Sequence, residues 1–173
     1  MKIRYLVLAI IGAMVLSLGL VACGDDDDDN GGNGNGGGEL TLAEYFSALE
    51  PLSQTFDADV DLLDAGESLD EFVGFVEDGK SLVDGFVGDL EGLNAPAEVA
   101  DAHSEAVSAG QELVEMYDNA ITVLDLSETF VDATLVLEGP GFVDSQDRFA
   151  AACVALQGVA DSNALDVDLA CPG

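Results

Sequence analysis

Basic residues are almost missing from this sequence of 173 residues. It contains 35 Asp and Glu but only 4 Lys and Arg, which gives a formal charge of −31 at pH 7. Two of the four precede the first acid, so Lys80 and Arg148 are the only basic residues in the acidic remainder. A surface of this sign repels nucleic-acid phosphates and anionic lipid headgroups, and this excludes nucleic-acid binding. A saline habitat and simple drift of an exported surface both explain the acidity, and the sequence leaves both open.

Histidine is nearly as scarce, because His103 is the only one. A single histidine excludes any Ser-His-Asp or Cys-His catalytic arrangement that is not built on His103, and a di-iron site needs histidines on two helices. Glu98, Asp101 and Glu105 lie near it, on what we expect to be the exposed first turns of a helix. We therefore interpret His103 as a solvated helical residue. The sequence predicts no catalytic residue, no metal site, no cofactor and no enzyme.

One acidic run, Asp57 to Asp61, begins like a calcium-binding loop. An EF-hand needs glycine at the sixth position and glutamate at the twelfth. This chain has Leu62 and Ser68 there. Val60 and Leu63 also fit the apolar stripe of a helix, so we predict a helix here rather than a metal site.

The first 23 residues carry the clearest signal in the chain. Lys2 and Arg4 precede an almost wholly apolar stretch that ends in Leu20-Val21-Ala22-Cys23. This order resembles the signal peptide and lipobox of bacterial lipoproteins. The resemblance implies that residues 1–22 are a signal peptide cleaved between Ala22 and Cys23. It also implies that the Cys23 sulfur, as a thiolate nucleophile, receives a diacylglyceryl group.

Such an anchor would hold the mature chain at the cell membrane, on the extracytoplasmic side. Two acyl chains bind a membrane far more firmly than one. A transmembrane helix is the competing interpretation, because residues 5–22 approach the shortest length that spans a bilayer. The abrupt change after Cys23 into Gly24 and five aspartates favours cleavage. In lipoproteins of bacteria with two membranes, an aspartate directly after the lipidated cysteine tends to signal retention in the inner membrane. This chain has Gly24 at that position, and the sequence leaves open whether the inner or the outer membrane holds it.

Residues 23–38 are predicted to be the lipidated cysteine and a flexible tether. Asp25 to Asp29 and the Gly- and Asn-rich run to Gly38 contain no apolar residue, so this segment has nothing to bury in a core. A random coil of this length reaches about 20 Å. Weak divalent-cation binding by the aspartates is the alternative to a plain spacer. We favour the spacer, because nothing fixes the geometry of the carboxylates.

From residue 39 to 173 the apolar residues recur at steps of three and four, the spacing of amphipathic helices. The first stripe runs from Leu42 to Leu63. Pro51 lies inside it and predicts a kink or a restart near Glu50, because proline removes a backbone hydrogen bond and clashes with the preceding turn. The second helix is predicted over residues 68–92, where four glycines would let a neighbouring helix approach.

The later helices are predicted from their start and stop signals. The third is predicted to start with Asn94 or Ala95 as its N-cap and Pro96 in its first turn. Its pattern breaks at 125–127 and resumes, and residues 138–141, Glu-Gly-Pro-Gly, are a stop. The last helix covers about 144–159. No strand alternation of any length is present, so we predict an all-α fold, an antiparallel bundle of four to five helices.

Two cysteines remain once Cys23 carries lipid. Exported compartments are oxidising, so we predict a disulfide between Cys153 and Cys171 that pins the C-terminal segment to the last helix. A reactive or metal-binding thiol pair is the alternative, but no histidine or further cysteine lies near in sequence. The Cys153…Cys171 pattern and the phrase from Leu93 to Val99 also resemble uncharacterised helical-bundle lipoproteins of bacteria. That resemblance implies a bundle fold and no assigned activity.

These observations favour a non-catalytic envelope lipoprotein that binds another envelope component or a small ligand. The alternative is a cation or cationic-ligand binding protein of the cell envelope, which the acid excess suggests.

Overall fold

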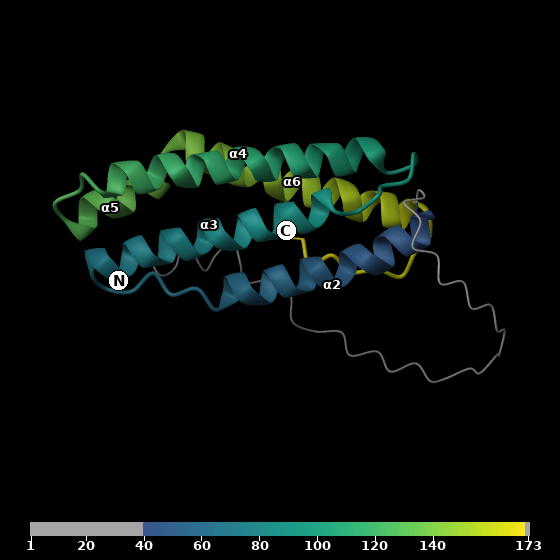
Figure 1. The fold of residues 1–173 in the computed structure, drawn as a ribbon, viewed down its shortest axis with the longest axis horizontal. Helices are drawn as coiled ribbons and strands as arrows, with labels where there is room; N and C mark the ends of the chain where they lie inside the picture. The colour runs from purple at the N-terminus through teal and green to yellow at the C-terminus, as the bar shows by residue number, and fades with distance from the viewer. Residues whose placement is uncertain (1–39, 172–173) are drawn as a thin grey trace. The chain divides into compact units, whose positions relative to one another are not determined.

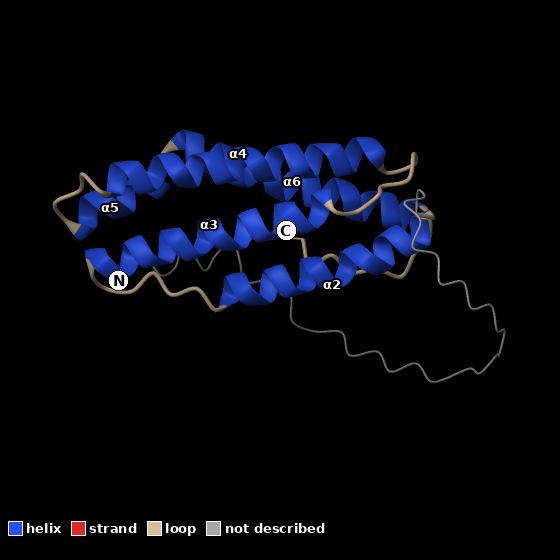
Figure 2. Cartoon of the chain, in the orientation of Figure 1, coloured by secondary structure: helices blue, strands red, loops and turns tan. Residues whose placement is uncertain are grey.

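The computed structural model describes residues 40–171, and this part of the chain forms five α-helices (Figure 1). These are α2 (Leu42–Asp61), α3 (Leu69–Glu91), α4 (Ala100–Leu124), α5 (Phe130–Leu137) and α6 (Pro140–Ser162). Figure 2 shows helices and loops but no strand in this range, and the four long helices run in alternating directions along the chain. The predicted all-α bundle is therefore confirmed. No helix within residues 40–171 is both long enough and apolar enough to span a membrane.

The first two helices begin at matching capping boxes. The hydroxyl of Thr41 accepts the backbone N–H of Glu44, whose side chain in turn accepts the backbone N–H of Thr41. Ser68 and Glu71 form the same reciprocal pair at the start of α3. Each box satisfies two N–H groups that the first turn of a helix leaves unpaired, and this fixes where the helix starts.

Pro51 lies inside α2, and the helix continues through it without interruption. Of the two outcomes predicted near Glu50, a kink or a restart, the restart is therefore wrong. Pro51 itself is exposed, while Tyr45, Phe46 and Leu49 before it are almost completely buried. Their packing outweighs the loss of one backbone hydrogen bond.

α4 begins at Ala100 with Val99 as its N-cap, later than the N-cap predicted at Asn94 or Ala95. The segment before it has other partners: the carbonyl of Asn94 accepts the N–H of Leu40, and the carbonyl of Pro96 accepts the N–H of Val99. Residues 94–99 therefore form a turn-containing connection, with Pro96 buried.

The break predicted at 125–127 is confirmed, because α4 ends at Leu124 and α5 begins at Phe130. The stop at residues 138–141 ends α5, but Pro140 is also the first residue of α6. Proline suits this position, because the first turn of a helix has no use for its missing N–H. The last helix is thus longer at both ends than the predicted 144–159.

α4 is the central helix of the bundle. It packs against α3 along one side and α6 along another, and it also contacts α5, whereas α2 packs mainly on α3. Gly110 makes the α3–α4 approach close, since a Cβ there would lie 2.4 Å from Val87 Cγ2. Of the four glycines of α3, only Gly79 has a neighbour within 4 Å of where its Cβ would be, and that neighbour is Tyr117 of α4.

Both basic residues of the described range pair with carboxylates of α4. Lys80 of α3 binds Asp118, and Arg148 of α6 binds Glu105 at 2.9 Å and Glu112. These partly exposed pairs each contribute little to stability. They matter more for the surface charge, because both basic side chains are already paired with α4 and neither is free to balance the other carboxylates of the described residues.

Candidate functional site

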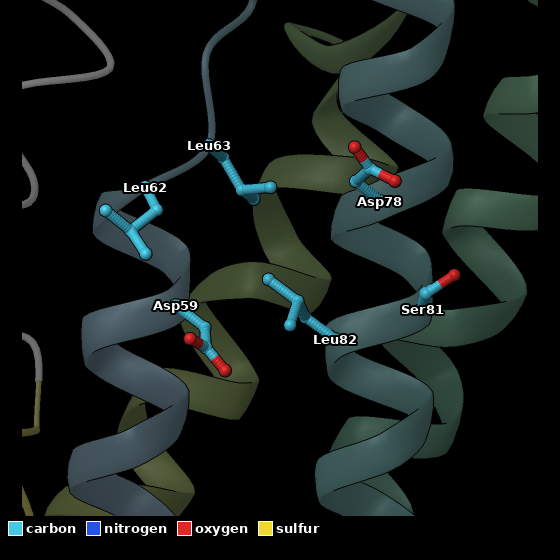
Figure 3. A pocket seen from close by; sticks show the side chains of 6 residues that line it. All are labelled: Asp59, Leu62, Leu63, Asp78, Ser81 and Leu82. Carbon is cyan, nitrogen blue, oxygen red and sulfur yellow. The ribbon is translucent and has the colours of Figure 1, made fainter.

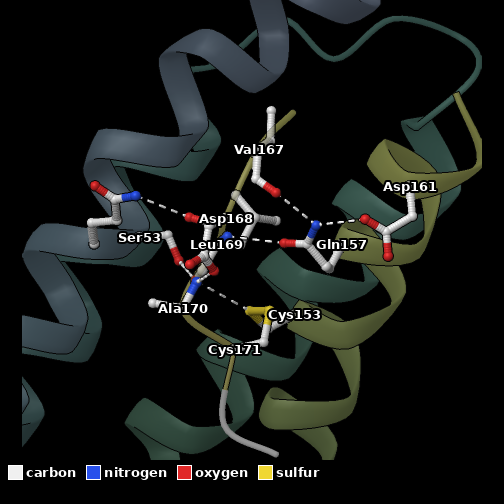
Figure 4. The surroundings of a disulfide bond; sticks show 10 residues. Ser53, Cys153, Gln157, Asp161, Val167, Asp168, Leu169, Ala170 and Cys171 are labelled. Atoms are coloured by element: carbon white, nitrogen blue, oxygen red, sulfur yellow. Dashed lines mark hydrogen bonds between the residues drawn. A yellow bond between two sulfur atoms is a disulfide. The ribbon is translucent and has the colours of Figure 1, made fainter. Parts of the chain in front are cut away.

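The disulfide lies where the C-terminal segment returns along the bundle. Cys153 of α6 is bonded to Cys171, with a Cα–Cα distance of 5.6 Å. The pairing predicted from the cysteine count is confirmed. Figure 4 shows the bond beside the last described residues, 165–171, which we call the tail.

The tail is hydrogen-bonded to α2 on one side. Ser53 Oγ donates to the carbonyl of Leu169 (2.5 Å), and Gln54 Nε2 donates to the carbonyl of Asp168 (3.1 Å). The backbone N–H of Asp168 donates to Glu50 Oε1 at 2.9 Å. Polar side chains of α2 therefore satisfy the tail's backbone as a neighbouring strand would.

On its other side the tail is bound to α6 (Figure 4). Gln157 Nε2 donates to the carbonyl of Val167, and Gln157 Oε1 accepts the N–H of Leu169, both at 2.9 Å. The side chain of Leu169 is 1% exposed and belongs to the same core cluster as α2 and α6. The tail thus joins α2 to α6, and the disulfide links the end of the tail covalently to α6.

His103 is only half-buried, but it is not the solvated residue that the sequence predicted. Its Nδ1 lies 2.9 Å from the hydroxyl of Tyr45, a side chain that is 0% exposed. Burial lowers the pKa of His103 below 6.5 and raises the pKa of Tyr45. A neutral imidazole bonded to a buried phenol connects α4 to α2, which is a structural role.

The acidic run from Asp57 to Asp61 lies within α2, as predicted. Burial, followed by the nearby charges of Asp61 and Asp168, raises the pKa of Asp57. Across residues 40–171, no group of three or more His, Cys, Asp or Glu side chains is placed to hold a metal ion.

An open groove lies between the end of α2 and the middle of α3 (Figure 3). Its volume is about 430 Å³, and its lining is partly apolar and partly acidic. The lining residues are Asp59, Leu62 and Leu63 from the end of α2, and Asp78, Ser81 and Leu82 from α3. We call this the α2–α3 groove.

The groove follows from how α2 ends. Leu62 is the C-cap of α2, and its side chain is 80% exposed. In Figure 3, Leu63 and Leu82 extend toward the space between the two helices. Ser81 is small, and its hydroxyl donates to the carbonyl of Glu77 in its own helix.

The carboxylates of Asp59 and Asp78 line the groove without a counter-charge. Within the described residues neither side chain makes a hydrogen bond or an ion pair, and Lys80, the nearest basic residue in sequence, is bound to Asp118. A second hollow beside the first half of α2 is lined by Ala43, Glu44, Ser47 and Ala48. It offers no large apolar side chain, so the α2–α3 groove is the better candidate for a binding site.

Sequence reasoning missed this groove. Leu62 and Leu82 lie outside the apolar stripes of their helices, each beside a stripe residue, Leu63 and Val83. Two such adjacent apolar residues widen the apolar face of each helix beyond what packing of two helices needs, and this was the available signal.

The predicted anchor residues, Ala22 and Cys23, lie outside the described residues, as does the predicted tether. The chain matches no protein-family model, no curated protein and no solved structure. The resemblance of its bundle to helical-bundle lipoproteins therefore stays a prediction.

Proposed function

We propose that this chain is a lipid-anchored bacterial envelope lipoprotein whose helical bundle serves as a non-catalytic binding or interaction module. The observation that carries the proposal is the order of signals in the first 23 residues: basic, then apolar, then Leu20-Val21-Ala22-Cys23. Diacylglyceryl transfer to Cys23 would place the mature chain on the extracytoplasmic face of the membrane. Residues 24–38 would hold the bundle off that surface.

The described residues support a binding role through the α2–α3 groove. Leu62 is a large apolar side chain that the fold leaves 80% exposed, and Asp59 and Asp78 beside it have no partner in the described chain. A groove of this kind offers both apolar area and charge to another molecule. The disulfide and the tail hold α2 in position, so the groove is built on a fixed element.

Cell fractionation of two matched variants tests the anchor. Cys23→Ser removes the sulfur that would carry the lipid, whereas Gly24→Ser introduces the same side chain one residue later. We expect Cys23→Ser to release the protein from the membrane fraction and Gly24→Ser to leave it there. Equal membrane retention of the two variants would contradict the proposal.

A second candidate function is binding of cations or cationic ligands. It is supported by 35 acidic residues set against Lys80 and Arg148, both of which are already ion-paired. Calorimetric titration of the mature chain with calcium tests it, since a saturable heat at millimolar calcium is expected. No binding in that range would remove this candidate.

A further inference from the structure

We infer that the α2–α3 groove receives a basic amphipathic segment of a partner protein. This rests on the proposed function and names its ligand class. The apolar part of the site comes from Leu62, Leu63 and Leu82, and the charged part from Asp59 and Asp78. A segment with leucine-like anchors on one face and lysine or arginine beside them matches both parts.

The open form of the groove favours a protein segment over a small molecule. Small-molecule sites are concave and bury most of the ligand surface. Here Leu62 is 80% exposed and the groove is open to solvent along the two helices (Figure 3). Two neighbouring helices with an apolar surface between them match the helix-in-groove mode, in which an amphipathic helix lays its apolar side chains into the groove.

The negative charge of the groove indicates that its ligand is positively charged. The chain's own tether contains five consecutive aspartates, Asp25 to Asp29, so it is repelled by Asp59 and Asp78. A second copy of the chain presents the same acid excess, since Lys80 and Arg148 are ion-paired within the bundle. A basic segment removes this repulsion and finds two carboxylates that have no partner in the described chain.

The test uses the mature chain from residue 23 with Cys23→Ser, so that no lipid binds the probe. The probe is a short helical peptide of leucine and lysine carrying a fluorophore, and fluorescence anisotropy reports its binding. A peptide with glutamate in place of lysine is the control. We expect saturable binding of the lysine peptide that weakens as salt is added, and no binding of the glutamate peptide.

Two matched pairs of variants locate the binding. Leu62→Ser removes the exposed anchor of the groove, and Leu126→Ser changes a leucine with the same 80% exposure in the α4–α5 connection. We expect Leu62→Ser to weaken binding about tenfold, the equivalent of one buried leucine, and Leu126→Ser to leave it unchanged. Asp78→Asn should weaken binding about threefold and flatten its salt dependence, while Asp89→Asn, the same change on α3 outside the groove, should do neither.

Three results would overturn the inference. Absence of saturable binding removes the ligand class. Equal weakening by Leu62→Ser and Leu126→Ser, or by Asp78→Asn and Asp89→Asn, would show a general attraction of a cationic peptide to an acidic protein. Self-association of the chain that Leu62→Ser abolishes would assign the groove to a second copy. None of these results bears on membrane retention through Cys23, so failure of the anchor and failure of the groove remain distinguishable.

Discussion

Breaking the disulfide between Cys153 and Cys171 should release the tail and weaken the attachment of α2. The tail makes hydrogen bonds to three side chains of α2, and it joins α2 to α6. Without the bond, the tail keeps its hydrogen bonds to α2 and to Gln157 of α6, together with the burial of Leu169. The perturbation is the double substitution Cys153→Ser with Cys171→Ser, in a chain that also carries Cys23→Ser.

The size of the effect follows from the loop that the bond closes. The two cysteines are 18 residues apart, and a cross-link over this length stabilises a protein by about 3 kcal/mol in the chain-entropy model. For a domain of this size that corresponds to a fall in Tm of roughly 10 °C. We expect urea unfolding to show the free-energy loss and thermal unfolding to show the shift in Tm.

The location of the effect is as informative as its size. Hydrogen exchange should accelerate first in the tail and in the second half of α2, while α3 and α4 stay protected. The Cys23→Ser chain treated with a reductant should behave like the double variant, which controls for the serine side chains. A stability loss below about 0.5 kcal/mol, within the range of ordinary surface substitutions, would refute this reasoning. Uniform acceleration across all helices would refute the claim that the tail holds α2.

Three further predictions concern single residues, each measured by urea unfolding. The first compares two glycines: Gly85→Ala should stabilise the protein by up to about 1 kcal/mol, because no side chain lies near its Cβ position. Gly110→Ala should destabilise it, because a Cβ would clash with Val87. A change in the free energy of unfolding with the same sign for both would contradict the packing. Ala164→Gly should stabilise by about 1 kcal/mol, because Ala164 follows α6 with φ of 54°, a left-handed conformation that glycine adopts without strain; a loss of stability would contradict this. Burial lowers the pKa of His103 below its ordinary 6.5 in the folded chain, so the unfolded chain binds more protons than the folded chain as the pH falls through 6.5. The difference in the free energy of unfolding between the wild type and His103→Gln should therefore narrow below pH 6.5. A difference that stays constant with pH would contradict this.

Helix positions were largely predictable, because the apolar stripes and the capping residues are local signals. Ser68 with Glu71 marks the start of α3 in the sequence, and the structure uses that pair as a capping box. The break after Leu124 was visible for the same reason. Local pattern and tertiary packing agree at these positions, and this agreement makes them predictable.

The errors arose where distant contacts decide the outcome. α2 continues through Pro51 because Tyr45 and other side chains before it pack in the core. His103 is half-buried because the hydroxyl of Tyr45, 58 residues away, lies against it. The spacing of residues within one helix does not contain either contact.

The α2–α3 groove was missed for a related reason. The exposure of Leu62 depends on where α2 ends and on the absence of a covering side chain from any other described helix. An apolar residue beside an apolar stripe looks like part of the core until the neighbouring helices are placed.

The central claim is that Cys23 carries the lipid that holds this chain at the membrane. Its most direct test is the intact mass of the protein extracted from membranes with detergent. Lipidation predicts a chain that begins at Cys23 and carries a diacylglyceryl group on that residue. A mass equal to the unmodified chain from Met1 to Gly173 would contradict it.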